Sequence, residues 1–453
     1  MKVVIDGAGE IGSHLAKLLV REGNDVAVID SERSRLDNLC ASVDIEPVEG
    51  EPTSLKSLID AQAGKADLFI AVVPYVDQEV NMIASLFAKN LGAKKVVARI
   101  QNLDLLSKSS RQMMRDLGLD MTFCPEKIAA DEIVSQLRYN TASDTMDFAR
   151  GKFHIAAFRL GEDSPIIDMR LVDFTKHFSE KENSEFRVIA LSREDKTIIP
   201  KFDTKFKYGD MVYIITKSDG VKSLNNYLGL EDIAVKRVMI MGGGSVGAIV
   251  ASFLVHEVSS VKLIELKHDR CLELVEELPE EVEVVNGDAR NSDFLYEQGL
   301  HTCDAFVAVT GSDEANILAC VAAKKFGVSR TVAEVENMEY VRLAEEMGVD
   351  VVINKKLTTA SRIYKLTLSD RAKFVRYMSG TDAEVMEYTA AEGSAITKDT
   401  LKNIDFPSDA VIGGVLRGND AFIAVGDTRI QKDDRVAVFT MPSCAKEVDK
   451  LFK

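Results

Sequence analysis

Val3–Gly12 reads VVIDGAGEIG, and this stretch decides the fold because an apolar strand runs into a glycine-rich turn of the form G-x-G-x-x-G. The pattern recurs at Met239–Gly247, which reads MIMGGGSVG. An acidic residue, Asp30 or Glu265, follows the last glycine of each turn by eighteen positions. The two glycine turns and the two acids are displaced by the same 235 positions, which indicates an internal duplication. One such turn is a weak motif, whereas two in the same strand–turn–helix context predict nucleotide binding.

Short apolar runs and helical runs alternate after each turn. In the first copy we expect strands at Val26–Ile29, Leu68–Val73 and Lys95–Ile100, with helices at Arg33–Ala41 and Glu79–Asn90. The second copy repeats this order, with strands at Val261–Ile264, Ala305–Val309 and Arg330–Val335 and helices at His268–Leu278 and Glu314–Phe326. Short apolar strands separated by helices are typical of a parallel sheet that helices cover on both faces.

A segment of different texture follows each alternating region. Helical periodicity fades there, and short β-branched runs with turn signals take over. Arg193 and Asp210 recur 224 positions later as Arg417 and Asp434, so this smaller segment is duplicated as well. We therefore predict an α/β chain with two Rossmann-like nucleotide-binding domains, each followed by a small β-rich α+β domain. The expected boundaries are 1–141 and 142–229 for the first pair, and 234–369 and 370–453 for the second.

Charge and cysteine content exclude several classes of function. The 453 residues include 72 acidic and 56 basic side chains, and the net charge of −16 repels nucleic acid and anionic lipid alike. The six cysteines form no C-x-x-C pair and no cluster with histidine, which argues against a metal site and fits a reducing cytoplasm. Val238–Val255 has no charge over eighteen residues, but three glycines divide it into a strand and a helix start. We therefore expect no membrane insertion.

The two turns are the candidate phosphate sites. Glycines in this pattern allow a tight turn, a close approach of the backbone to a pyrophosphate, and close packing of helix on strand. The helix that follows directs its N–H groups at the anion. A turn kept only for packing is the alternative. The candidate residues are Gly7, Ala8, Gly9, Glu10, Ile11 and Gly12 in the first copy, and Gly242, Gly243, Gly244, Ser245, Val246 and Gly247 in the second.

Acidic residues beside the turns indicate which nucleotide is bound. Asp30 and Glu265 end their second strands, where a carboxylate accepts both ribose hydroxyls and repels a 2′-phosphate. Their equal placement favours this role over ordinary strand-end charges, and it favours NAD or an adenine nucleotide over NADP. Asp6, directly before the first glycine, is irregular: either a local hydrogen bond neutralises it, or it weakens anion binding in this copy.

The end of the fifth strand differs between the copies. Arg99 is placed to clamp a phosphate, whereas Glu334 at the equivalent position cannot, so the two sites are expected to differ in ligand, affinity or occupancy. Solvated strand-end charges are the alternative. The histidines share no spacing, and the small domains show no obvious acid–base group. We therefore expect binding without catalysis.

Two dinucleotide folds, each with a small β-rich domain and no catalytic module, make the whole chain resemble the TrkA family. Its members are cytoplasmic regulatory subunits of bacterial Trk potassium uptake systems, built from tandem RCK (KTN) domains. The resemblance rests on Gly7–Gly12, Ala71–Val73 with Asn81 and Met82, Val97–Ile100, Gly242–Gly247, Gly287 with Asp288, Asp313–Asn316 and Val415–Asp420.

The resemblance implies a homo-oligomer, a dimer or tetramer ring, docked beneath a membrane-embedded potassium transporter of the Trk type on the inner face of the plasma membrane. NAD(H) or ATP/ADP binding would then shift the ring and gate the pore. It also implies one site made of Gly7–Ile11, Asp30 and Arg99, and a second made of Gly242–Val246, Glu265, Asp288 and Thr310. Val73 and Pro74 stand where the family often has Thr-Ser hydroxyls near the ligand.

Other roles remain open at this stage. The helical stretches Glu126–Leu137 and Lys355–Leu368 are candidates for hinge or dimer contacts, or are plain packing helices. The alternative functions are an NAD-dependent oxidoreductase with two active units and a nucleotide-responsive adaptor of a different ion carrier.

Overall fold

A computed structural model describes residues 1–74, 78–138, 145–148, 152–161, 164–182, 185–193, 196–217, 220–228, 235–364, 372–377 and 383–453. The chain divides into two compact units. The first is Met1–Ala129 with Lys355–Thr367, and the second is Ala130–Asn354 with Leu368–Lys453.

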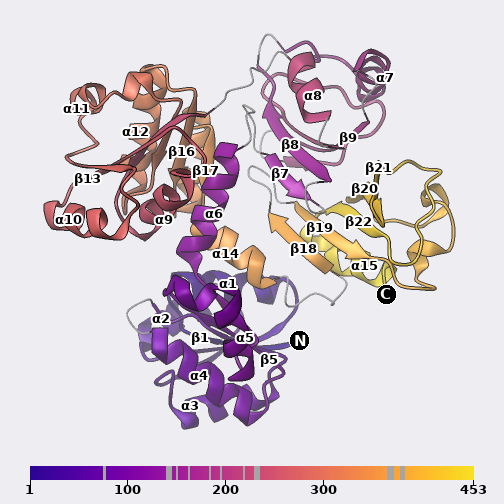
Figure 1. Ribbon diagram of the computed structural model, residues 1–453. Helices are drawn as coiled ribbons and strands as arrows, with labels where there is room; N and C mark the ends of the chain where they lie inside the picture. The colour runs from indigo at the N-terminus through magenta and orange to yellow at the C-terminus, as the bar shows by residue number, and fades with distance from the viewer. Residues whose placement is uncertain are drawn as a thin grey trace. The chain divides into compact units, whose positions relative to one another are not determined.

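The first unit is built on a parallel sheet with the strand order β3-β2-β1-β4-β5-β6, with helices against both faces (Figure 1). Its strands are β1 (Lys2–Asp6), β2 (Asp25–Asp30), β3 (Glu46–Glu49), β4 (Leu68–Ala71), β5 (Lys95–Arg99) and β6 (Met121–Phe123). Its helices include α1 (Glu10–Arg21), α2 (Arg33–Cys40), α3 (Leu55–Asp60), α4 (Gln78–Leu91) and α5 (Lys108–Asp116). Because both faces are covered, successive residues of β1 from Val3 to Asp6 are all buried.

Two helices link the parallel sheets to the small domains. Helix α6 (Pro125–Arg138) begins in the first unit and continues into the second. Helix α14 (Lys355–Tyr364) follows the second parallel sheet in the chain but belongs to the first unit, where it packs on α1. The Lys356 ammonium there lies 3.2 Å from a Glu10 carboxylate oxygen. The helical character predicted for these stretches is confirmed, except that residues 365–368 lie outside the described part of the chain.

The second parallel sheet repeats the order, as β14-β13-β12-β15-β16-β17. Its strands are β12 (Arg237–Met241), β13 (Ser260–Glu265), β14 (Val282–Asn286), β15 (Ala305–Ala308), β16 (Arg330–Glu334) and β17 (Val351–Ile353). Its helices are α9 (Ser245–Leu254), α10 (His268–Glu277), α11 (Ser292–Glu297), α12 (Asp313–Lys325) and α13 (Met338–Glu346). The uncharged stretch at Val238–Val255 is thus a strand and a helix, and within the described residues no helix is long and apolar enough to cross a membrane.

The displacement between the copies is not constant. It is 235 positions at β1 and β2, 237 at β4 and 235 again at β5. It is also 237 at β3, because Glu49 pairs with Asp30 and Asn286 pairs with Glu265. The second copy therefore gains two residues between β2 and β3 and loses two in the loop after β4. Because both changes fall in connections, the two sheets keep the same strand order.

The small domains are antiparallel sheets with the orders β10-β9-β11-β8-β7 and β18-β19-β22-β20-β21, which confirms the expected fold class. The first contains β7 (Thr145–Phe148), β8 (Phe153–Arg159), α7 (Leu171–Glu182), β9 (Phe186–Arg193), β10 (Lys196–Ile198), β11 (Met211–Lys217) and α8 (Gly220–Leu228). The second contains β18 (Ala372–Tyr377), β19 (Glu384–Thr389), β20 (Ala410–Arg417), β21 (Asp420–Ile423), β22 (Arg435–Thr440) and α15 (Ala445–Leu451). The exact four domain boundaries stay a prediction.

The residue pairs that revealed the second duplication are bonded to each other. The Arg193 guanidinium donates to both carboxylate oxygens of Asp210, at 2.7 and 2.8 Å. Arg417 binds Asp434 in the same way, at 2.9 and 2.8 Å. Both aspartates are buried, so these bidentate pairs satisfy charges that would otherwise be costly inside the sheet.

The two small sheets share one hydrophobic cluster within the second unit. Phe153 and Ile155 of β8 and Ile215 of β11 belong to the same cluster as Val385 of β19 and Phe439 of β22. The packed faces therefore form a common core, like the interior of a sandwich.

Candidate nucleotide-binding sites

The second glycine turn has the geometry that phosphate binding requires. Gly242 has φ = +111°, a conformation that only glycine adopts without strain. A Cβ on Gly247 would lie 2.0 Å from the Gly242 carbonyl oxygen, so α9 packs directly on the turn. A Cβ on Gly244 would meet no atom within 4 Å, which leaves the N-terminus of α9 open to an approaching anion.

The first turn repeats this geometry. Gly7 has φ = +112°, and a Cβ on Gly12 would lie 1.8 Å from the Gly7 carbonyl oxygen. A Cβ on Gly9 would also meet nothing within 4 Å. The two turns are therefore equivalent in backbone shape, although their sequences differ between the glycines.

The predicted ribose acids hold both turns in place. Glu265 accepts the Gly243 N–H on one carboxylate oxygen and the Lys267 N–H on the other, both at 2.8 Å. Asp30 accepts the Ala8 N–H at 2.7 Å and the Glu32 N–H at 2.8 Å. Because each carboxylate oxygen accepts about two hydrogen bonds, each acid keeps acceptor capacity for ribose hydroxyls.

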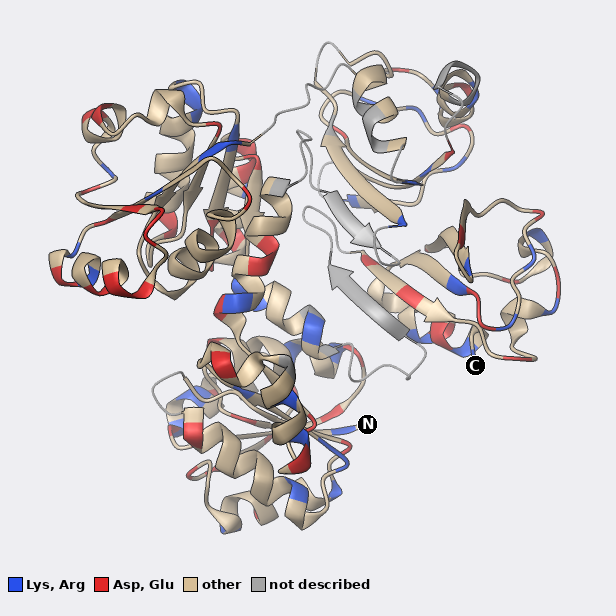
Figure 2. Cartoon of the chain, in the orientation of Figure 1, with Lys and Arg blue, Asp and Glu red and all other residues tan. Residues whose placement is uncertain are grey.

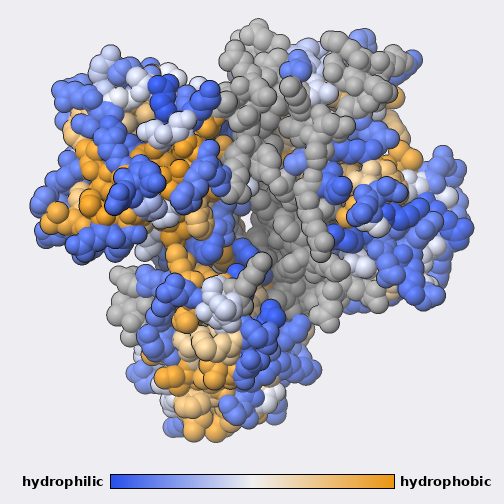
Figure 3. All heavy atoms as spheres, viewed as in Figure 1, coloured by the Kyte–Doolittle hydropathy of each residue, from blue (hydrophilic) through white to orange (hydrophobic). Residues whose placement is uncertain are grey.

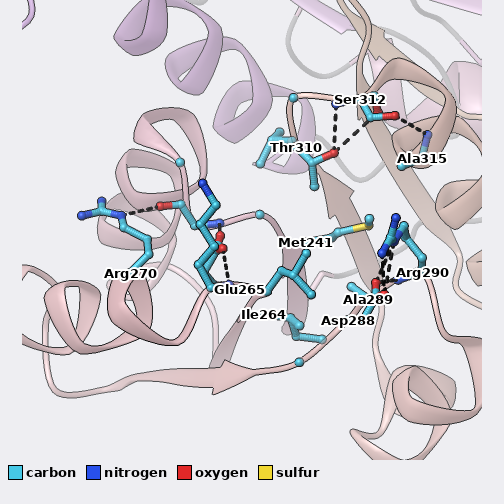
Figure 4. A pocket seen from close by; sticks show the side chains of 18 of the residues that line it. Met241, Ile264, Glu265, Arg270, Asp288, Ala289, Arg290, Thr310, Ser312 and Ala315 are labelled. Atoms are coloured by element: carbon cyan, nitrogen blue, oxygen red, sulfur yellow. Dashed lines mark hydrogen bonds and ion pairs between the residues drawn. The ribbon is translucent and has the colours of Figure 1, made fainter.

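A cavity of about 880 Å³ opens over the second turn, at the carboxyl edge of its sheet (Figure 4). Its volume lies within the usual range for small-molecule sites, roughly 300–1,000 Å³. The predicted residues that line it are Gly242, Gly243, Gly244, Glu265, Asp288 and Thr310. These six residues lie together at the carboxyl edge of the parallel sheet, whereas Ser245, Val246 and Gly247, which were also predicted, lie in α9 and do not line the cavity.

Two arginines at this cavity were not predicted. The Arg270 side chain lies at this cavity (Figure 4), and its Nε donates to the Gly243 carbonyl oxygen at 3.0 Å. Its guanidinium also binds Glu273 and Glu277, at 2.8 and 2.9 Å, on α10, a helix that carries several acidic residues (Figure 2). The Arg290 guanidinium binds Asp288 through both carboxylate oxygens and lowers the pKa of Asp288 to about 2. These guanidinium groups are therefore already matched with carboxylates.

A buried asparagine positions the loop beneath the cavity, and this role too was not predicted. The Asn316 Oδ1 accepts the N–H and the hydroxyl of Thr310, at 3.0 and 2.7 Å. Its Nδ2 donates to the carbonyl oxygens of Thr310 and Glu334. Asn81 is its equivalent in the first copy. The sequence indicated these residues in two ways: Asn81 and Asn316 share the 235-position displacement of the glycine turns, and both belong to the stretches that resemble the TrkA family.

In the first copy, Asn81 holds the expected loop and strand end. It accepts the Val73 N–H at 2.9 Å and donates to the carbonyl oxygens of Val73 and Arg99. The Arg99 guanidinium binds Glu126 at 2.9 Å, so a phosphate would have to compete with this carboxylate. Val73 is half-buried and Pro74 is exposed, and residues 75–77 lie outside the described part of the chain.

The structure excludes one of the two alternatives for Asp6, that a local hydrogen bond neutralises it. Its side chain is fully buried, and neither carboxyl oxygen has a hydrogen-bond partner. The alternative in which a local hydrogen bond neutralises it was therefore wrong. Burial and, to a lesser degree, the charge of Asp30 raise the pKa of Asp6 to about 8, so it is mostly protonated at neutral pH.

Family comparisons agree with the repeated architecture. The TrkA-N domain matches residues 3–125 and 238–355, and the TrkA-C domain matches residues 155–229 and 385–453. The chain belongs to the TrkA family. A Trk system potassium uptake protein TrkA homolog of Archaeoglobus fulgidus is 33% identical, with 100% of both chains covered.

Other relatives give the same result. The Trk system potassium uptake protein TrkA of Haemophilus influenzae is 30% identical over 100% of this TrkA-family chain and 99% of its own. Among solved structures, a GsuK channel bound to NAD matches with a TM-score of 0.61 and 16% identity, over 100% of this chain and 78% of that one. At this identity the structural likeness concerns the fold.

Proposed function

We propose that this chain is a regulatory subunit that binds NAD(H) or an adenine nucleotide at both glycine turns and thereby gates a Trk-type potassium uptake transporter. The observation that carries the proposal is the cavity over Gly242–Gly244, where an open helix N-terminus and a ribose-type acid, Glu265, face the same space. The named relatives are potassium uptake proteins, which supports the transport role and agrees with a non-catalytic chain.

The residues present suit an adenosine that carries a pyrophosphate. The pyrophosphate would lie at the N-terminus of α9, where Gly244 leaves room and the helix dipole favours negative charge. The Glu265 carboxylate has unused acceptor capacity for the ribose hydroxyls. The Glu265 carboxylate would repel a 2′-phosphate, and the two arginines at the cavity are already bound to carboxylates. This arrangement favours NAD(H) or ATP/ADP over NADP(H).

Gating requires that nucleotide favour one arrangement of the assembly over another. The relatives' names support a membrane-embedded potassium transporter as the partner, which would hold this chain at the inner face of the plasma membrane. The Rossmann-like domains also expose large apolar side chains suited to contacts between chains (Figure 3). They include Ile83 and Phe87 on α4, Met113 on α5 and Leu117 directly after it, Leu318 on α12, and Leu343 on α13 and Met347 directly after it. These faces support a homo-oligomeric ring.

Glycine-to-aspartate substitutions test the two sites separately. Gly9 and Gly244 are the N-caps of α1 and α9, a position that aspartate favours, and neither would clash with a new side chain. Each variant places a negative charge where the phosphate is expected. Gly161→Asp, in a loop of the first small domain with equal space around it, is the matched control.

The measurement is calorimetric titration of the full chain with NAD, NADH, ATP and ADP. We expect two sites in the wild type and in Gly161→Asp, one in Gly9→Asp or Gly244→Asp, and none in the double variant. Nucleotide binding of unchanged stoichiometry in the double variant would contradict the proposal.

Two further experiments separate the alternatives. Co-purification from membranes should recover a Trk-type transporter, and consistent recovery of a non-potassium carrier would favour the adaptor function. Turnover of NADH with carbonyl substrates would favour the oxidoreductase.

A further inference from the structure

The first Rossmann-like domain has a buried acid where the second has a methionine. Asp6 is the last residue of β1, in register with Ile29 of β2 and Ala71 of β4. Its side chain is fully buried, and both carboxyl oxygens lack a hydrogen-bond partner. The equivalent Met241 lines the cavity of the second domain (Figure 4). The two sites therefore differ at one position directly before the phosphate turn.

A buried carboxyl group without a partner is stable only in its neutral form, because an isolated charge is poorly solvated there. Burial and the Asp30 carboxylate raise the pKa of Asp6 to about 8. Burial and Asp30 are the two causes of this shift, and cations on the surrounding elements bind other carboxylates. These described pairs are Arg35 of α2 with Glu32 and Asp30, Lys356 of α14 with Glu10 of α1, and Arg99 of β5 with Glu126 of α6.

A nucleotide phosphate would bring negative charge to the residue next to Asp6. Gly7 begins the turn, and the open position at Gly9 is where the anion would approach the helix. Two negative charges this close in a low-dielectric interior repel strongly, so an ionised Asp6 and a bound phosphate oppose each other. The neutral acid removes that repulsion.

We propose that a proton on Asp6 is a co-ligand of the nucleotide in the first domain, so that this site takes up a proton when it binds at alkaline pH, whereas the second does not. The inference rests on the proposed function, because it assumes that nucleotide occupies the first turn. The two copies then respond to different signals: the first site responds to nucleotide and pH together, and the second responds to nucleotide alone.

The coupling between proton binding by Asp6 and nucleotide binding determines how strongly the affinity of the first site depends on pH. If nucleotide binds only when Asp6 is neutral, affinity falls tenfold for each pH unit above the pKa. With the pKa at about 8, the dissociation constant at the first site should rise about tenfold from pH 7 to pH 9. The second site, with Met241 in place of Asp6, should show no such change.

The test uses the full chain carrying Gly244→Asp, so that only the first site is read, and NADH as the probe, because its pyrophosphate does not titrate in this range. We expect binding about tenfold weaker at pH 9 than at pH 7, and a calorimetric enthalpy at pH 9 that depends on the ionisation enthalpy of the buffer. Asp6→Asn should abolish both effects, and so should Asp6→Met, which introduces the side chain that the second domain has at this position. Gly9→Asp, which leaves the second site, should show neither.

The outcomes separate this inference from the proposed function. Intact NADH binding with equal affinity at both pH values overturns the inference and leaves the proposed function standing, as does a pH effect that persists in Asp6→Asn. No NADH binding to the wild type at either pH overturns the proposed function itself. If the Asp6 variants fail to fold, Met241→Asp combined with Gly9→Asp gives the reciprocal test, since it should make the second site pH-dependent; pH-independent NADH binding by that variant overturns the inference.

Discussion

Asp30 accepts the Ala8 N–H of the first turn and the Glu32 N–H that follows its own strand, and it still has acceptor capacity on both carboxylate oxygens. We expect Asp30→Ala to weaken binding of adenine nucleotides at the first site by about ten- to a hundredfold, since hydrogen bonds to a charged group contribute about 1.5–3 kcal/mol. Asp37→Ala is the control, because Asp37 is exposed and binds Arg33 on the surface of α2. Equal affinities of the two variants by calorimetry would argue against a ribose role for Asp30.

Asp6 should also make folding depend on pH. Between pH 4 and pH 8 the unfolded chain has released this proton while the folded chain keeps it, because its pKa rises from 3.8 to about 8 on folding. The free energy of unfolding therefore decreases by up to about 1.4 kcal/mol per pH unit across this range. We expect Asp6→Asn to raise the melting temperature at pH 8 by several degrees relative to the wild type, and to have much less effect at pH 4. A difference in melting temperature that is the same at both pH values would contradict this account.

At the scale of the elements, the junction between strand, turn and helix leaves no room for a side chain at its last glycine. We expect Gly247→Ala to destabilise the protein by more than about 2 kcal/mol, because the new Cβ would overlap the Gly242 carbonyl oxygen and force α9 away from the turn. Gly244→Ala, three residues earlier in open space, should change stability far less. Denaturant unfolding of the two variants measures the difference, and equal stabilities would contradict the tight packing.

The elements also show how far the sequence predicts the fold. Central strands such as β1 and β4 were predicted, because burial on both faces demands continuous apolar runs. Strand β3 was not, since its sequence EPVE is polar and it lies at the sheet edge. Helix α7 was also missed. Its Phe174 and Phe178 are spaced for one helix face and both pack on Phe186, but the β-branched runs around them predict a β-rich segment.

The candidate sites also contain some features that the sequence predicts and others that it does not. Backbone roles of the glycines follow from their spacing, and so does the position of Glu265 at a strand end. Contacts between side chains that are far apart in the sequence cannot be predicted from spacing. The pairing of Arg99 with Glu126 and the loop clamp of Asn316 depend on contacts between elements distant in the chain, which no local pattern contains.

At the scale of the whole molecule, duplication extends to the core that joins the small domains. A Cβ on Gly414 would lie 2.8 Å from the Phe153 ring, although the two residues belong to different small domains. We expect Gly414→Val to destabilise this shared core by about 1–3 kcal/mol. Gly426→Val is the control, because the nearest atom to its Cβ, on Lys402, lies 3.5 Å away. Calorimetric unfolding should show a lower transition for the first variant alone, and an unchanged transition would mean that the sheets adjust freely.

The position of α14 has a consequence for synthesis on the ribosome. This helix, Lys355–Tyr364, packs on α1 of the first unit, and its Ala360 and Ile363 are fully buried in the folded chain. An N-terminal domain usually folds as soon as it leaves the ribosome, but here the first unit lacks one of its packing partners until more than 350 residues have been made. During that interval α1 lacks the helix that packs on it, including the Lys356 partner of Glu10. The earliest domain to be translated is therefore among the last to be completed.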